Sequence, residues 1–84
     1  MAGKGFLDVV VISPQRLIYH GRADHVILPG ENGAFEILPY HKRLLSRLLP
    51  GLLTIERKAI RIKRGVVKVD LNRVTAIVEE PNDT

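Results

Sequence analysis

Cysteine is absent from this sequence of 84 residues, and aromatic residues make up only 5% of it. Without cysteine the chain can form no disulfide, no thiolate zinc site and no thiol nucleophile, a composition that suits a reducing compartment. Apolar runs are also short, and none approaches the length of about 18 residues that a membrane-spanning helix needs. The amino terminus carries Asp8 inside its first apolar stretch, which is not the pattern of a signal peptide. We therefore expect a soluble, intracellular domain.

Aliphatic residues supply most of what is there: hydrophobic residues make up 45% of the chain, and its formal net charge is +4. A chain of this size forms one domain with a thin core, since it hides only roughly 60–65% of its unfolded surface. The positive charge permits binding to nucleic acid or to an anionic membrane, but its main effect is solubility. We expect a single domain over residues 1–80 and a frayed tail over residues 81–84.

Short runs rich in valine and isoleucine alternate with turn signals, a pattern that predicts an all-β sandwich or barrel. The first run ends in four consecutive apolar residues, Val9 to Ile12, which predicts burial on both faces near the end of its strand. Side chains alternate in Ile60-Arg61-Ile62-Lys63, and Val67, Val69 and Leu71 repeat the pattern as a second buried row. The expected strands cover residues 6–12, 16–19, 23–28, 34–38, 52–56, 59–63, 66–70 and 74–78.

The segment between Pro39 and Pro50 is ambiguous. Its leucines, Leu44, Leu45, Leu48 and Leu49, have helical spacing. The two prolines leave only about ten residues between them, which is marginal for an isolated helix. We favour an extended or bulged strand.

Catalytic chemistry has little support in the sequence. The three histidines, His20, His25 and His41, have no second ligand at metal-binding spacing. Ser13 and Ser46 would need a convergent histidine and carboxylate to act as nucleophiles, and Ser13, which precedes Pro14, is more simply a turn residue. We expect no catalytic residue, no metal site and no cofactor.

Nucleic-acid binding is the alternative function. Five cations concentrate on one predicted hairpin, namely Arg57, Lys58, Arg61, Lys63 and Arg64, and His41-Lys42-Arg43 adds a second basic patch. Small basic β-barrels bind single strands in this way, but they interleave aromatic residues on which bases stack. Here every phenylalanine and tyrosine precedes residue 41. Strand edges guarded by lysine and arginine against association are the more ordinary interpretation.

The segment from Pro29 to Gly51 carries the most specific pattern in the chain. It reads Pro-Gly-x-x-Gly-x-Phe-x-Ile-Leu-Pro-x-His-x-x-Leu-Leu and closes on Leu-Pro-Gly. With Leu7-Asp8-Val9-Val10 and Ser13-Pro14 upstream and residues 65–75 downstream, it closely resembles the ε subunit of F-type ATP synthase. The resemblance covers nearly the whole chain in the family's order.

This resemblance implies a flattened ten-stranded β-sandwich that couples the γ subunit to the membrane c-ring during proton- or sodium-driven ATP synthesis. Such a subunit is non-catalytic and belongs to the central stalk, peripheral to the cytoplasmic face of a bacterial-type inner (plasma) membrane. The residues implied to face the c-ring are Asn32, Gly33, Ala34, Phe35, Glu36, Ile37, Leu38, Pro39 and Tyr40. Those implied to face γ are Ser13, His41, Leu44 and Ser46. His41 has a second interpretation, as a side chain that hydrogen-bonds its own loop.

The chain departs from the family pattern in two places that bear on charge. Glu36 stands where the family usually has glycine, and Lys42-Arg43 stands where Ala-Pro is common. Family members also continue into a helical hairpin that can bind ATP and restrain the motor in some species. The sequence stops at Thr84, so the resemblance predicts neither ATP binding nor helix-based inhibition.

Overall fold

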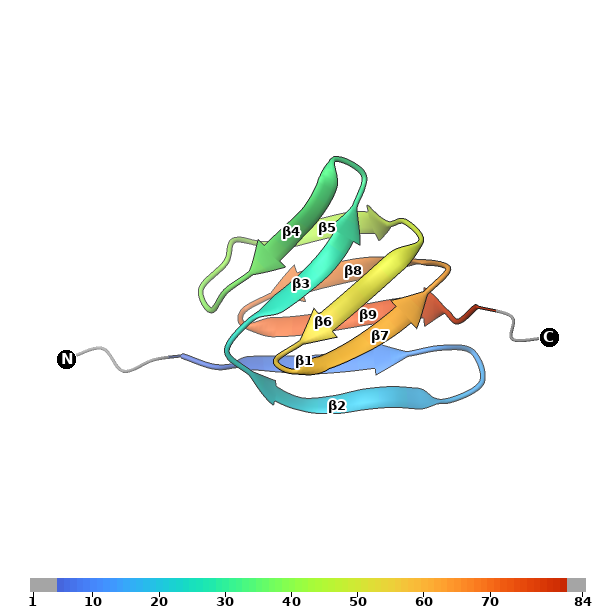
Figure 1. The fold of residues 1–84 in the computed structure, drawn as a ribbon. Helices are drawn as coiled ribbons and strands as arrows, with labels where there is room; N and C mark the ends of the chain where they lie inside the picture. The colour runs from blue at the N-terminus through green and yellow to red at the C-terminus, as the bar shows by residue number, and fades with distance from the viewer. Residues whose placement is uncertain (1–4, 82–84) are drawn as a thin grey trace.

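The computed structural model describes residues 5–81, and these form two β-sheets with no helix (Figure 1). Sheet A has five strands in the order β2-β1-β9-β8-β5, and sheet B has four in the order β4-β3-β6-β7. All neighbouring strands are antiparallel except β1 and β9, which are parallel. The strands are β1 (Leu7–Ile12), β2 (Leu17–Ala23), β3 (Val26–Gly30), β4 (Gly33–Ile37), β5 (Leu44–Leu48), β6 (Gly51–Ile55), β7 (Lys58–Ile62), β8 (Arg64–Asp70) and β9 (Arg73–Glu79).

The two sheets stack as a sandwich with a core of aliphatic side chains between them (Figure 1). Because successive side chains of a strand point to opposite faces, every second residue enters the core. In β1 these are Leu7, Val9 and Val11, and in β9 they are Val74, Ala76 and Val78, all essentially buried. Each large aliphatic side chain buried in this way contributes about 1.5–3 kcal/mol. The predicted all-β sandwich is thus confirmed.

Nine strands are present in residues 5–81, so the expectation of ten is wrong for this part of the chain. The ambiguous segment before Pro50 is strand β5, at the edge of sheet A, as we favoured. The second strand is longer than predicted, since β2 runs through Gly21 to Ala23 in register with β1. The ring of Tyr19 packs over Gly21, which lies in the gap left between the expected strands at residues 16–19 and 23–28.

Burial differs from the expectation in two places. Leu71 does not continue the buried row of Val67 and Val69, because it lies in the β8–β9 turn and is 89% exposed. The outward-facing Val10 and Ile12 of β1 are only half-buried, so the first strand is covered fully on one face alone. Of the predicted tail, Pro81 follows β9, and residues 82–84 lie outside the described residues. The described residues include no helix able to cross a membrane.

Candidate docking surfaces

The segment implied to face the c-ring folds as a hairpin and the loop after it. Glu31 and Asn32 make the β3–β4 turn, and Gly33 follows with φ of 109°, a value that favours glycine. Ala34 and Glu36 point outward from sheet B, whereas Ile37 is buried and Phe35 packs against the core. A partner can therefore touch the β3–β4 turn, the outward-facing Ala34 and Glu36, and the exposed Leu38 and Tyr40.

His41 bonds to its own loop. Its Nδ1 lies 2.7 Å from the carbonyl oxygen of Lys42, so Nδ1 carries the proton and donates. Its backbone N–H donates to the carbonyl of Leu38 at 3.2 Å. The geometry supports a loop-holding role for this half-buried residue.

The other three residues implied to face γ do not form one cluster with His41. Leu44 and Ser46 lie on β5, where Leu44 packs against the core and the Ser46 hydroxyl donates to the Arg47 carbonyl at 3.2 Å. Ser13 follows β1. In sheet A, strands β9 and β8 lie between β1 and β5. The buried Ser13 hydroxyl accepts the backbone N–H groups of Gln15 and Arg16, each at 3.2 Å, so the predicted turn role is confirmed.

The outer face of sheet A carries an apolar band that sequence reasoning missed. The strand registers place Ile12 beside Ile77, Ile77 beside Val66, and Leu17 on the far side of Ile12. Leu17 is 59% exposed, Ile77 49% and Val66 40%. In the neighbouring row Thr75 and Lys68 separate the half-buried Val10 from the exposed Leu45 on β5. The sequence signal for this band was the continuous apolar run from Val9 to Ile12 at the end of the first strand.

Charged rows flank the apolar band on both sides. On one side the registers order Arg22, Asp8, Arg73 and Asp70 across four strands, and Arg43 ends the row with an ion pair to Asp70 at 3.2 Å. On the other side Glu79 pairs with Arg64 at 3.0 Å and Lys63 at 3.7 Å. An apolar centre with a polar, charged rim is the usual anatomy of a protein interface.

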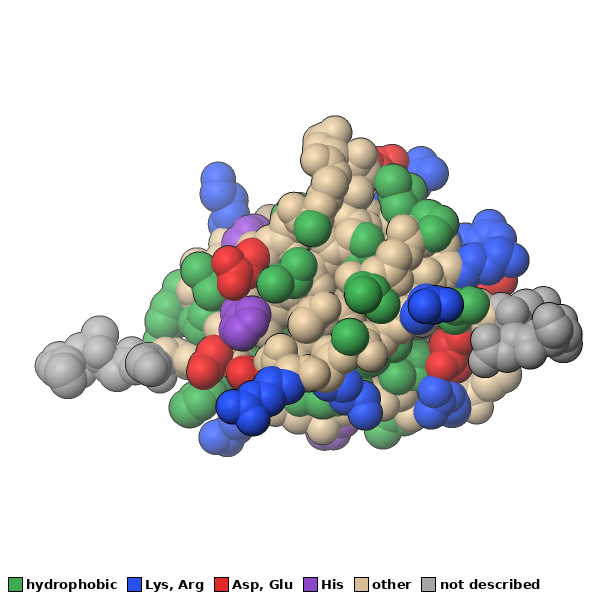
Figure 2. All heavy atoms as spheres, in the orientation of Figure 1, with side chains coloured by type: hydrophobic (Ala, Val, Ile, Leu, Met, Phe, Trp, Pro, Cys, Tyr) green, Lys and Arg blue, Asp and Glu red, His purple; other side chains and the backbone are tan. Residues whose placement is uncertain are grey.

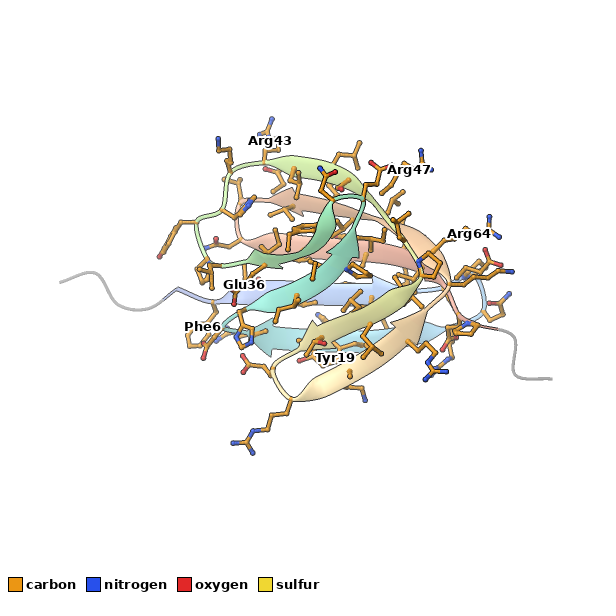
Figure 3. All side chains as sticks on the ribbon, turned by 45° about the horizontal axis from the view of Figure 1, so that its top comes forward. Phe6, Tyr19, Glu36, Arg43, Arg47 and Arg64 are labelled. Carbon is orange, nitrogen blue, oxygen red and sulfur yellow. The ribbon has the colours of Figure 1, made fainter. Side chains whose placement is uncertain are left out.

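The outer face of sheet B is different in character. It presents small or apolar side chains, such as Pro29, Ala34, Thr54 and Ala59, around the exposed Leu52. Figure 2 looks onto this face and shows charged side chains mainly around its margin. In Figure 3 Glu36 and Phe6 lie toward one end of the molecule, and Arg47 and Arg64 lie toward the other.

The basic hairpin does not form one continuous cationic stripe. Lys63 and Arg64 are both paired with Glu79, and Arg61 projects from the outer face of sheet B. Nothing in the described residues adds support to nucleic-acid binding. Residues 5–81 include no group of three or more histidine, aspartate or glutamate side chains that could hold a metal.

The fold and this surface place the chain in the class of small all-β sandwich domains with an apolar, charge-rimmed face suited to docking. The chain belongs to the family of the ATP synthase delta/epsilon chain β-sandwich domain, whose family model matches residues 6–81. Its curated relatives include the ATP synthase epsilon chain of Nitratiruptor sp., 41% identical over 78 residues that cover 87% of this chain and 60% of the relative. The epsilon chain of Sulfurimonas denitrificans is 37% identical over the same shares. The chain thus spans about 60% of the length of these relatives.

Solved structures share the fold. A cryo-EM structure of the central stalk and c-ring of the Tetrahymena thermophila mitochondrial ATP synthase contains a chain that matches with a TM-score of 0.73 and 18% identity, covering 94% of this chain and 67% of that one. A chain of the Euglena gracilis mitochondrial ATP synthase matches with a TM-score of 0.80 and 17% identity, covering 94% and 54%. At these identities the likeness shows the fold alone.

Proposed function

We propose that this chain is a non-catalytic subunit of the central stalk of an F-type ATP synthase. It joins the γ subunit to the c-ring, so that the two turn as one rotor during proton- or sodium-driven ATP synthesis. Family membership supports this role, and so do the structural relatives, which come from assemblies containing the c-ring. The chain reaches the membrane through the complex, at the cytoplasmic face of a bacterial-type inner membrane.

The observation that carries this proposal is the apolar band on the outer face of sheet A. Exposed Ile77, Val66 and Leu17 leave apolar area in water that a partner would bury, and burial contributes roughly 25 cal/mol per Å². We assign this face to γ because β5, which carries Leu44 and Ser46, forms the edge of sheet A and presents Leu45 on the outer face; the side chains of Leu44 and Ser46 point to the inner side of the sheet. Ser13 contributes by shaping the β1–β2 turn.

The c-ring then meets the β3–β4 hairpin, at Asn32, Gly33, Ala34 and Glu36, with Leu38 just after it. This hairpin belongs to sheet B and carries acidic residues, Glu31 and Glu36, and no cation. A c-ring loop with lysine or arginine would complement it in charge. Two separate surfaces on one rigid sandwich are what a coupling subunit needs.

Size-exclusion chromatography of the chain mixed with the γ subunit of the same synthase tests this function. We expect a one-to-one complex that survives moderate salt, because its centre is apolar. Purified c-ring and a single-stranded oligonucleotide are run as separate arms. Failure to bind γ, or salt-sensitive binding to the oligonucleotide alone, would contradict the proposal.

A further inference from the structure

Two turns at one end of the sandwich hold large residues in the left-handed backbone region. In the β8–β9 turn Leu71 has φ of 50° and Asn72 has φ of 62°, and in the β4–β5 loop Tyr40 has φ of 68°. Two-residue hairpin turns with both φ values positive favour Asn-Gly sequences. Bulky side chains at such positions are strained.

Neither Leu71 nor Tyr40 gains burial in exchange for this strain. Leu71 is 89% exposed and Tyr40 is 75% exposed. Backbone strain that persists at an exposed position is typical of binding sites, where local preference is given up for function. The two side chains therefore need an explanation outside the folding of the isolated chain.

Hydrogen bonds tie the two turns into one base. The Tyr40 backbone N–H donates to Oδ1 of Asn72 at 2.6 Å, and the Asp8 backbone N–H donates to the Asn72 carbonyl at 2.8 Å. We call the two projecting side chains the Tyr40–Leu71 knob. Because its base is held in place, the knob loses little conformational freedom when it binds.

Cations surround the knob. Lys42 and Arg43 line the same surface hollow as Tyr40 and Leu71, and Arg73 lies two residues after Leu71. The nearby acids are Asp70, which pairs with Arg43 at 3.2 Å, and Asp8, which lies opposite Arg73 in the β1–β9 pair. Positive charge exceeds negative charge around the knob, so its complement is an apolar pocket with carboxylates at the rim.

We propose that the Tyr40–Leu71 knob anchors this chain in an apolar, acid-rimmed pocket of the γ subunit. This inference rests on the proposed docking of γ to the outer face of sheet A. Leu71 lines one hollow with Lys68, Arg73 and Thr75, which all lie on that outer face, so a partner that covers the face reaches the knob. Tyr40, which the resemblance implied to face the c-ring, is assigned to γ here because its backbone is bonded to Asn72 of the β8–β9 turn, whereas the hairpin assigned to the c-ring belongs to sheet B.

Asparagine tolerates the left-handed region, so Leu71→Asn separates binding from folding. The affinity of the full chain for purified γ is measured by calorimetry, and thermal unfolding is measured in parallel. We expect Leu71→Asn to raise Tm by about 4 °C or more through relief of strain while weakening γ binding by about tenfold or more. Tyr40→Asn is expected to weaken binding in the same direction. Leu52→Asn, on the outer face of sheet B, is the control and should leave affinity within about twofold.

The outcomes separate this inference from the function on which it rests. If the wild type forms no complex with γ, the proposed function fails and the anchor fails with it. If the wild type binds γ and both knob variants bind equally well, the anchor alone is wrong. Weakened binding of the knob variants to c-ring, with γ affinity unchanged, would also overturn the assignment of the knob to γ.

Discussion

Gly65 lies where strands β8 and β9 of sheet A approach one another closely. A Cβ at this position would lie 2.6 Å from the carbonyl oxygen of Ile77 and 3.1 Å from Cα of Val78. Both of those atoms belong to the backbone of β9, which cannot move aside without disturbing its ladder. The glycine is therefore required by packing between β8 and β9.

Gly65→Ala is expected to lower the free energy of unfolding by about 1–3 kcal/mol, as overpacking does. Urea unfolding followed by circular dichroism measures it. Gly21→Ala is the matched control in the same sheet, because its nearest contact, at 3.0 Å, is the hydroxyl end of the Tyr19 side chain. That side chain can shift, so an equal loss in the two variants would contradict the explanation.

Ser13 and Ser46 are both implied to face γ, yet they have different roles in the isolated chain. Ser13→Ala leaves two backbone N–H groups of the β1–β2 turn without their acceptor and is expected to destabilise by about 0.5–1.5 kcal/mol. Ser46→Ala removes one exposed bond and should change stability by less than about 0.5 kcal/mol. Chemical unfolding of both variants checks this, and similar values would show that the turn does not depend on the hydroxyl.

At the scale of elements, alternation was the reliable signal. Ile60 and Ile62 lie in the core while Arg61 faces out, as their spacing predicted. Proline limits correctly favoured a strand over a helix for β5. The break expected at Gly21 is absent, because Tyr19 packs over this glycine and the hydrogen-bonded ladder with β1 continues through it. The strand expected over residues 23–28 ended too early, since β3 also includes Pro29 and Gly30, which pair with Ala34 and Gly33.

The end of β9 is tied to the β1–β2 turn by an ion pair between Arg16 and Glu80. Nε of Arg16 lies 3.2 Å from one carboxylate oxygen and its Nη2 lies 2.6 Å from the other. This hydrogen bonding holds the pKa of Glu80 below its usual value and raises that of Arg16. No other described contact joins these two elements through charged side chains.

Because the Glu80 pKa is lowered on folding, its stabilising effect is complete above the unfolded pKa and is lost as pH falls through the folded pKa. Glu80→Gln is expected to lower Tm slightly at neutral pH. The difference from the wild type should shrink as the solution is acidified, and also at high salt, since the pair is exposed. Differential scanning calorimetry across pH measures it; a difference that grew toward acid would contradict the pairing.

At the scale of the whole molecule, the outer face of sheet A could not be predicted from the sequence. Its band joins Ile12 from the start of the chain to Ile77 from the end through the parallel β1–β9 pair. The alternation of side chains predicts only that Val66 and Ile77 point away from the core. Which of these residues lie side by side depends on strand register, and the pairing of β1 with β9 leaves no local mark.

The segment from Pro29 to Gly51 was more informative about family than about contact. Its turn skeleton led to the correct family, but Ile37 and Phe35 from the same segment point to the core rather than to a partner. Tyr40 and His41 lie in its loop, beside the distant Leu71 and Asn72. A contiguous motif is therefore divided between packing and surface by the fold.

The central claim is that γ docks on the outer face of sheet A, and a pair of matched substitutions tests it most directly. Ile77 on that face and Leu52 on the outer face of sheet B are 49% and 54% exposed, and both lie within strands. The dissociation constant for γ is measured for Ile77→Asp and Leu52→Asp after each is shown to be folded.

We predict a loss of affinity of about 100-fold for Ile77→Asp, because a carboxylate is then buried in an apolar interface, and a change within about threefold for Leu52→Asp. Equal affinities for Ile77→Asp and the wild type, or an equal loss in both variants, would contradict the claim.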